Sequence, residues 1–329
     1  MAETLLEVEG LYVEFRLRGR TVHAVNGLSY ELRAGETLAI LGESGSGKSV
    51  AAQAVMGILD TPPAYVTRGA VRFRGTDLLG LPERRRRAYR GANIAMIFQD
   101  ALSALNPVHR VGHQIAEMLR VHRGMPRSAA RARAVELMDR VRIPSAADRA
   151  DDYPHQFSGG MRQRVMIAMA LALDPDVLIA DEPTTALDVT VQAQIMKLLA
   201  ELQDELSMGL ILITHDLGVV ADVADRITVM YAGRAVEEAP VGELYERPGH
   251  PYTQGLLASV PRVDRRTAAL TPIAGAPPNL SAIPSGCPFH PRCPRARDRC
   301  ATEVPALRTV RPERSSACHY AEEVLDARR

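Results

Sequence analysis

The segment GESGSGKS, at residues 42–49, constrains the fold of this chain more than any other feature. It follows the apolar run Thr37–Leu41, which predicts a buried parallel strand, and it precedes a helical pattern from Lys48 to Leu59. Glycines at such a turn let backbone N–H groups converge on a phosphate, and the positive end of the following helix points at the same anion. A strand, a glycine-rich turn and a helix in this order predict a phosphate-binding loop in an α/β domain.

Lys48 and Ser49 close this loop. In a phosphate loop the lysine bridges the β- and γ-phosphates of a nucleotide, and the hydroxyl binds Mg²⁺. An ordinary glycine-rich turn between strand and helix is the alternative, but all eight positions and the surrounding pattern match the motif. We therefore expect ATP and Mg²⁺ as ligands.

Two carboxylates follow a second apolar strand, Val177–Ala180. The strand delivers Asp181 to the carboxyl edge of the sheet, where ligands of open α/β sheets bind. Asp181 is a candidate Mg²⁺ ligand, and Glu182 is positioned to polarise a water that attacks the γ-phosphate. Two solvated charges at the start of a turn are the alternative for this pair.

Two further features have bland interpretations when each is taken alone. Ser158-Gly159-Gly160 precedes an apolar helical segment and predicts either an anion site at a helix N-terminus or a plain serine N-cap. His215 ends the apolar strand Leu210–Thr214, which again places it at the ligand edge of the sheet, although a lone histidine is more often structural.

The remaining pattern places these motifs in an α/β domain. We expect short strands within residues 5–35, a strand at Asn93–Phe98, and helices from about residue 100 to 173. Strands and helices then alternate, with helices at Val189–Leu206 and Leu217–Val223 and a strand at Ile227–Met230. The alternation predicts a parallel sheet with a helical insertion. Residues 261–329 contain too few apolar runs to predict a core of their own.

Bulk composition excludes several classes. The hydrophobic fraction of 46% suffices for a globular core, and the net charge of +1 gives no support for a nucleic-acid partner. No apolar run reaches the length of about 18 residues that a membrane span needs. The first ten residues lack the basic and apolar regions of a signal peptide, so we expect a cytosolic chain.

All four cysteines lie near the C-terminus, at Cys287, Cys293, Cys300 and Cys318. In a reducing compartment such a group suggests a metal before a disulfide. The spacing lacks the paired C-x2-C units usual for structural zinc, and four thiolates can equally hold a [4Fe–4S] cluster. Zinc and free thiols stay open as alternatives, with His290 and His319 as possible substitute ligands.

The motifs occur in a characteristic order along the chain: GESGSGKS, IFQD, FSGGMRQR, LIADEP, ALD and ITHD. This order closely resembles the ATPase subunits of ATP-binding-cassette (ABC) transporters, from about Leu5 to the C-terminus. The resemblance implies a P-loop, RecA-like core with an antiparallel β-subdomain and a helical subdomain. It also implies a sandwich dimer, in which each ATP lies between the phosphate loop of one subunit and the Ser-Gly-Gly turn of the other.

The resemblance assigns roles to residues that the pattern alone leaves undecided. Phe15, or alternatively Tyr12, corresponds to the aromatic residue that stacks on adenine, and Gln99 to the glutamine that contacts Mg²⁺ and the attacking water. Asp188 corresponds to the aspartate at the subunit interface, and His215 to the histidine that contacts the γ-phosphate. The implied catalytic residues are Glu182, His215, Lys48 and Gln99. The implied nucleotide and Mg²⁺ ligands are Phe15, Gly42, Ser44, Gly45, Gly47, Lys48, Ser49, Val50, Gln99, Asp181, Ser158, Gly159, Gly160 and Asp188.

One branch of this family, the oligopeptide and dipeptide importers, is indicated by three further features. Phe157 and Met161 stand where the common signature has leucine and glutamine, and the segments HPYTQGLLASVP and GCPFHPRCP are similar to this branch. Some members of the branch carry an iron–sulfur cluster, so the resemblance favours [4Fe–4S] at the four cysteines. We expect a nucleotide-binding domain at residues 1–240, with its helical subdomain at about 100–173, and a metal-stapled C-terminal region at 241–329.

The implied function is ATP hydrolysis coupled to the uptake of dipeptides or oligopeptides at the cytoplasmic face of the membrane. The implied partners are a second homologous ATPase subunit, two transmembrane permease subunits and an extracytoplasmic peptide-binding protein. A nickel-chelate importer and a soluble, non-transport ABC ATPase are the alternatives.

Overall fold

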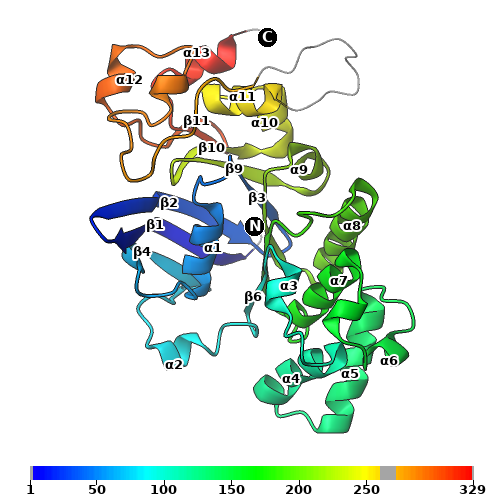
Figure 1. The fold of residues 1–329 in the computed structure, drawn as a ribbon. Coiled ribbons are helices and arrows are strands. Elements are labelled where there is room, and N and C mark those ends of the chain that lie inside the picture. Colours follow the sequence, from blue (N-terminus) through cyan, green and yellow to red (C-terminus); the bar gives the residue numbers. More distant parts are fainter. Residues whose placement is uncertain (1–2, 260–271, 328–329) are drawn as a thin grey trace. The chain divides into compact units, whose positions relative to one another are not determined.

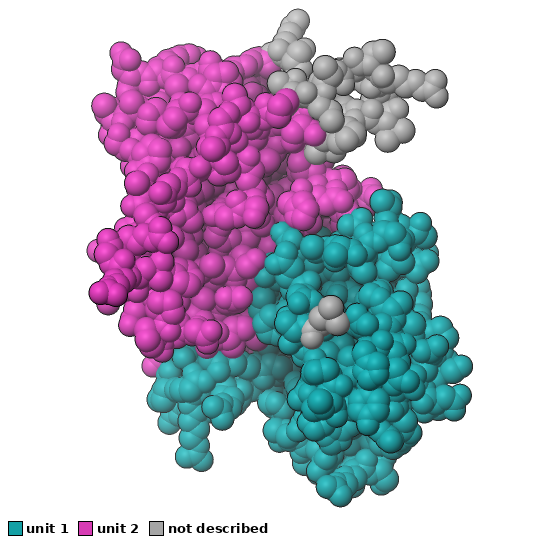
Figure 2. Space-filling view, in the orientation of Figure 1, with its two compact units in different colours: residues 1–5, 33–36, 81–212 teal, residues 6–32, 37–80, 213–329 magenta. Residues whose placement is uncertain are grey.

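The computed structural model describes residues 3–259 and 272–327 (Figure 1). These residues divide into two compact units (Figure 2). Unit 1 includes residues 33–36 and 81–212, and unit 2 includes residues 6–32, 37–80 and 213 onward. None of the helices in the described part of the chain is long and apolar enough to cross a bilayer.

An antiparallel sheet makes up the first layer of unit 2. Its order is β2 (Arg20–Arg33), β1 (Thr4–Leu17), β4 (Ala64–Phe73) and β5 (Thr76–Asp77). We expected short strands here, and that prediction was wrong, because β1 and β2 are 14 residues long each. Gly10 resembles a strand break in the sequence, but its φ of 52° falls at an irregularity in the β1–β4 register, so the strand continues through it.

The phosphate loop lies in unit 2, between β3 (Thr37–Leu41) and α1 (Lys48–Met56). All five residues of β3 are buried, and the strand pairs in parallel with β9 (Arg226–Tyr231). The predicted strand and helix are therefore confirmed. The helix ends before Leu59 because Gly57 adopts a left-handed conformation, with φ of 63°, and caps it.

The C-terminal region of unit 2 extends this sheet. β10 (Arg234–Pro240) pairs antiparallel with β9 and with β12 (Arg314–Ser316), and β12 pairs with β11 (Arg308–Arg311). The helices of unit 2 after β8 are α9 (Leu217–Val223), α10 (Val241–Glu246), α11 (Pro251–Ala258), α12 (Asp298–Thr302) and α13 (Ala321–Asp326), with a 3-10 turn at His290–Arg292.

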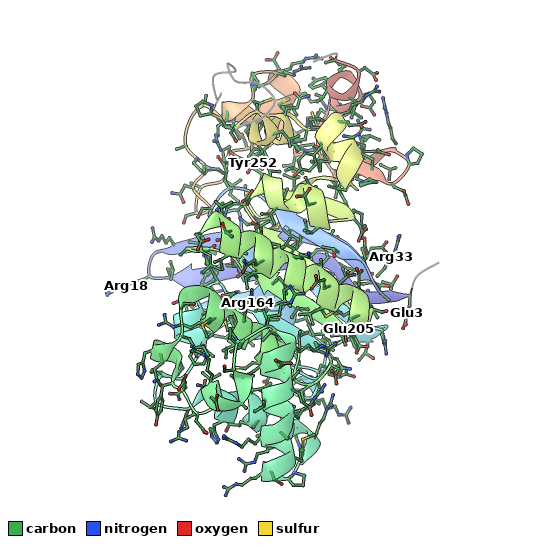
Figure 3. All side chains as sticks on the ribbon, turned by 90° about the vertical axis from the view of Figure 1, so that its right-hand side faces the viewer. Glu3, Arg18, Arg33, Arg164, Glu205 and Tyr252 are labelled. Atoms are coloured by element: carbon green, nitrogen blue, oxygen red, sulfur yellow. The ribbon has the colours of Figure 1, made fainter. Side chains whose placement is uncertain are left out.

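A small core nevertheless holds the C-terminal region. Within residues 272–327, the side chains of Phe289, Val324 and Leu325 are buried. The apolar partners come from earlier in the chain, where Tyr231 and Tyr252 contact the Phe289 ring at centroid distances of 5.2 and 5.3 Å. Tyr252, labelled in Figure 3, lies in α11.

Unit 1 contains the predicted helical insertion. β6 (Ile94–Ile97) and β7 (Val177–Asp181) are parallel neighbours, and β8 (Gly209–Thr214), which begins in this unit, lies next to β7. The helix α2 (Glu83–Arg86) precedes β6, and α8 (Val189–Leu206) follows β7. Between β6 and β7 the chain forms α3 (Ala101–Ala104), α4 (Val111–Arg123), α5 (Arg127–Arg140), α6 (Ala146–Arg149), a 3-10 turn at Pro154–Gln156 and α7 (Gly159–Ala170).

The insertion is held together by apolar helix faces. The helices α4, α5 and α7 pack against one another, as Figure 1 shows. Val111, Ile115 and Leu119 are buried on one face of α4, at the helical spacing that the sequence predicts. This packing positions the N-terminus of α7, where the Ser-Gly-Gly turn lies.

Candidate ATP-binding and catalytic site

Lys48 is held at the centre of the phosphate loop. Its side chain is buried, and its Nζ donates to the carbonyl oxygens of Gly42 and Glu43 at 2.8 and 3.1 Å. A Cβ at Gly47, where φ is 100°, would collide with the carbonyl oxygen of Ala24, so glycine is required at this turn. The loop is thus wrapped around an ammonium group, as a binding site for a polyanion requires.

The other predicted loop residues surround this lysine. Ser44 and Gly45 are exposed, whereas Ser49 and Val50 are half-buried in the first turn of α1. Ser46, which our sequence analysis did not single out, is buried, and no hydrogen-bond partner for its Oγ is found in the described part of the chain. Leaving a buried hydroxyl unpaired is costly, and a bound ligand is one source of a partner for Ser46 Oγ.

Unit 1 brings two of the predicted catalytic residues together. Asp181 is buried as the last residue of β7, and Glu182 follows it with φ of 47°, a left-handed conformation that non-glycine residues rarely adopt. Gln99 Nε2 donates to Glu182 Oε2 at 2.7 Å. The Thr185 hydroxyl, which our sequence analysis missed, donates to the same oxygen at 2.9 Å. Two donors therefore hold the carboxylate of Glu182.

The Ser-Gly-Gly turn caps α7 and packs against the start of α8. Ser158 is exposed and is the N-cap, with its Oγ accepting from the Met161 N–H at 3.4 Å. A Cβ on Gly160 would lie 2.6 Å from Cγ1 of Val191. Asp188 caps α8 by accepting from the Val191 N–H at 2.9 Å. The turn and Asp188 therefore lie on adjoining helix N-termini, and both are open to solvent.

His215 and the candidate adenine-stacking residues belong to unit 2. His215 is exposed, directly after β8 and before Asp216, which caps α9. Phe15 is half-buried and pairs with Ala64 across the sheet. The alternative, Tyr12, lies under the guanidinium of Arg68, 5.7 Å from its ring centroid, and packs against Gly27.

The four cysteines line a single cavity of about 350 Å³. They are free thiols. Burial, reinforced by the neighbouring thiols, raises the pKa of Cys287 and of Cys318 to about 11 each. His290 and His319 also line the cavity. Across residues 3–259 and 272–327, no three histidine, cysteine or acidic side chains are grouped in a way that could hold a metal ion.

Comparison with known proteins places these features in one family. The model of the ABC transporter family matches residues 25–185, and the model of the oligopeptide/dipeptide transporter C-terminal region matches residues 236–300. The dipeptide transport ATP-binding protein DppD of Bacillus subtilis is 52% identical over 94% of this chain and 92% of its own length. The chain belongs to the ATP-binding proteins of the ABC oligopeptide/dipeptide transporters.

Other members and solved cassettes agree with this ABC assignment. The oligopeptide transport ATP-binding protein OppD of Salmonella typhimurium is 52% identical over 98% of this chain and 96% of its own length. A dimeric post-hydrolysis structure of the cassette MJ0796 bound to ADP and Pi covers 72% of this chain and 98% of its own, with a TM-score of 0.64 and 27% identity. The structure of cbiO1 from Clostridium perfringens reaches a TM-score of 0.62 at 30% identity, over 74% of this chain and 91% of its own. The chain therefore has the α/β fold of an ABC ATPase, with an antiparallel β-subdomain.

Proposed function

We propose that this chain is the ATP-hydrolysing subunit of an importer that takes up dipeptides or oligopeptides. The similarity to DppD and OppD, which runs through the C-terminal region as well as the cassette, carries this proposal. The cassette supplies the motor, at residues 1–240, and the region from residue 241 distinguishes peptide transporters from other ABC ATPases.

The chain's own donors suit a magnesium nucleotide. The Ser49 hydroxyl and the Asp181 carboxylate are hard oxygen ligands of the kind that Mg²⁺ prefers. They would hold the ion, which neutralises phosphate charge when bound. Lys48 would then exchange its loop carbonyls for the β- and γ-phosphates, and Ser46 Oγ would gain the partner that it lacks within the described residues.

Glu182 is the residue that acts on the attacking water. Its carboxylate polarises that water, while Gln99 and Thr185 hold the carboxylate in a single orientation. His215 contacts the γ-phosphate and stabilises the developing charge. Phe15 stacks on the adenine.

A second subunit completes each site. Ser158, Gly159 and Gly160 present the N-terminus of α7, an anion-binding element, to the γ-phosphate held by the partner's phosphate loop. Asp188 belongs to the same interface. The dimeric form of MJ0796 with ADP and Pi supports this arrangement for the present chain.

The remaining partners follow from the transport role. The dimer of this chain with a homologous ATPase subunit docks on two permease subunits at the cytoplasmic face of the membrane, and an extracytoplasmic protein delivers the peptide. The dock lies near residues 101–120. There Val108 is 72% exposed in the loop before α4, which leaves an apolar contact for the permease.

The four cysteines of the cavity are the proposed ligands of an iron–sulfur cluster, although in the described residues they are not grouped in a way that could hold a metal ion. Its donor set is four thiols on one cavity of about 350 Å³. Cys287, Cys293, Cys300 and Cys318 would hold a [4Fe–4S] cluster, which supplies a structural staple when bound. Binding would also offset the raised thiol pKa, because a metal stabilises the thiolate.

Peptide uptake by cells that lack the chain tests the function. Cells that carry the wild-type gene are expected to accumulate labelled dipeptides or oligopeptides, whereas Lys48→Ala cells are not. Permease chains should co-purify with the wild-type chain and with the Lys48→Ala variant. Normal peptide uptake without the chain, or co-purification with ribosomes instead of permeases, would contradict the proposal.

Metal analysis and a visible spectrum test the cluster separately. Four atoms of iron per chain with a visible absorption band are expected, as the [4Fe–4S] formula requires. One zinc ion per chain and a colourless protein would contradict the cluster.

A further inference from the structure

Glu43, the second residue of the phosphate loop, is held by each of its polar groups. Its backbone N–H donates to the Tyr252 hydroxyl at 2.9 Å. Its carbonyl oxygen accepts from Lys48 Nζ at 3.1 Å and from the Ser46 N–H at 3.2 Å. Its carboxylate accepts hydrogen bonds from the guanidinium of Arg292. The conformation of the loop at this point therefore depends on residues outside the loop.

Arg292 forms a bidentate salt bridge with the Glu43 carboxylate. Nη1 lies 2.7 Å from Oε2 and Nη2 lies 3.0 Å from Oε1. The arginine side chain is 5% exposed and the glutamate side chain 25%, so solvent screens this pair far less than a surface pair. The remaining nitrogen, Nε, donates to the Ala274 carbonyl oxygen at 3.0 Å, and Nη1 reaches the Tyr231 hydroxyl at 3.3 Å.

Arg292 lies in the turn that carries two of the cavity cysteines, Cys287 and Cys293. Arg292 directly precedes Cys293, and the turn is closed by the His290 N–H donating to the Cys287 carbonyl oxygen at 2.9 Å. The rings of Tyr231, Tyr252 and Phe289 pack together behind the guanidinium, with Tyr231 and Tyr252 centroids 4.6 Å apart. The turn at Cys287–Cys293 therefore connects the cysteine cavity to the phosphate loop.

We propose that Arg292 is a positioning residue for ATP binding. Together with Tyr252, it holds Glu43 so that the phosphate loop keeps the conformation in which its N–H groups converge. The inference rests on the proposed function, because it concerns the same ATP site. It adds a role for the C-terminal region, which thereby sets the affinity of the cassette for its nucleotide.

The expected effect is on binding rather than on chemistry. A loop that spends only part of its time in the competent conformation binds ATP more weakly in proportion to that fraction. If loss of the Arg292–Glu43 salt bridge leaves the loop in the competent conformation about a tenth of the time, the Kd for ATP rises about tenfold. Because Arg292 contacts no catalytic group within the described residues, kcat at saturating ATP is expected to stay within about twofold of wild type.

Calorimetric titration of the full-length chain with Mg²⁺-ATP tests this, together with the KM and kcat of the assembled transporter. Arg292→Ala and Glu43→Gln are each expected to raise Kd and KM about tenfold, and the double variant no further, because both remove the same contact. Arg292→Lys keeps the charge but not the two-pronged geometry and is expected to rescue part of the affinity. Arg308→Ala removes an exposed arginine–carboxylate pair of the same region, with Glu322, and is the matched control.

Hydrogen exchange of the ATP-free chain supplies a reading that does not depend on turnover. Faster exchange at residues 42–49 in both Arg292→Ala and Glu43→Gln, but not in Arg308→Ala, supports the inference. Unchanged exchange and unchanged ATP affinity in the two variants would overturn it while leaving the ATPase function intact. A wild-type chain that fails to bind ATP would instead contradict the proposed function, and the exchange experiment would still decide whether Arg292 holds the loop.

Discussion

Replacing Arg314 with methionine should cost more stability than removing any surface ion pair of this chain. Arg314 and Glu237 pair at 3.0 Å between β12 and β10, and their side chains are 2% and 0% exposed. The Glu237 carboxylate also accepts from the backbone N–H groups of Gly249 and His250, at 2.5 and 3.0 Å. The pair therefore ties β10, β12 and the start of α11 together.

The magnitude follows from the uncompensated charge. Removing one partner of a buried pair costs about 3–5 kcal/mol, whereas an exposed pair contributes about 0–1 kcal/mol. We therefore expect Arg314→Met to lower the free energy of unfolding by about 3–5 kcal/mol, and Arg308→Met, which breaks the exposed pair with Glu322, to lower it by less than about 1 kcal/mol. Glu237→Gln in the Arg314→Met background should restore part of the loss, since no buried charge then remains.

Urea denaturation of the full-length, ATP-free chain provides the assay. The chain has no tryptophan, so far-ultraviolet circular dichroism is the appropriate signal. Equal losses in Arg314→Met and Arg308→Met would refute the reasoning, because they would show that burial adds nothing to this pair. A double variant less stable than Arg314→Met alone would refute it as well.

Two further predictions concern acid stability and the Ser-Gly-Gly turn. Burial lowers the pKa of His250 to about 3, so the stability that its neutral form contributes is complete above pH 6.5 and is lost below it, by about 2 kcal/mol at pH 5. The difference in unfolding free energy between pH 7 and pH 5 should shrink by that amount in His250→Asn, and an unchanged difference would contradict the assignment. Gly160→Ala brings a Cβ within 2.6 Å of Val191 Cγ1 and should lower ATP turnover of the assembled transporter about 10- to 100-fold by displacing the turn. Val191→Ala in the same chain should restore much of the turnover, and a failure to restore it would exclude steric displacement as the cause.

Elements with local signals were predictable from the sequence. The bounds of α8 and α9 agree with the predicted helices, because each helix begins directly after an aspartate whose side chain caps it, Asp188 and Asp216. The strands β4 and β10 were not predicted. β4 contains Gly69, whose φ of 107° and close approach to Gly10 arise only when β1 lies beside it.

In the candidate site, too, contiguous motifs were predictable from the sequence, whereas contacts between distant residues were not. The phosphate loop is a contiguous motif with its own strand and helix, so sequence alone locates it. The Gln99–Glu182 contact joins residues 83 apart, and only the family resemblance suggested their association. The Arg292–Glu43 contact joins residues 249 apart, and no motif signals it, because its geometry exists only after the aromatic residues of the C-terminal region have packed.

In the proposed mechanism Glu182 orients and polarises the water that attacks ATP, and the turnover of Glu182→Gln measures this role most directly. Glutamine keeps the shape of the side chain and the contact with Gln99 but removes the basic carboxylate. In the assembled transporter, turnover should fall by about 10²–10⁴-fold. ATP affinity should stay at the wild-type value, because Lys48 and the loop are untouched. Near-normal turnover, with ATP binding intact, would contradict the assignment of Glu182.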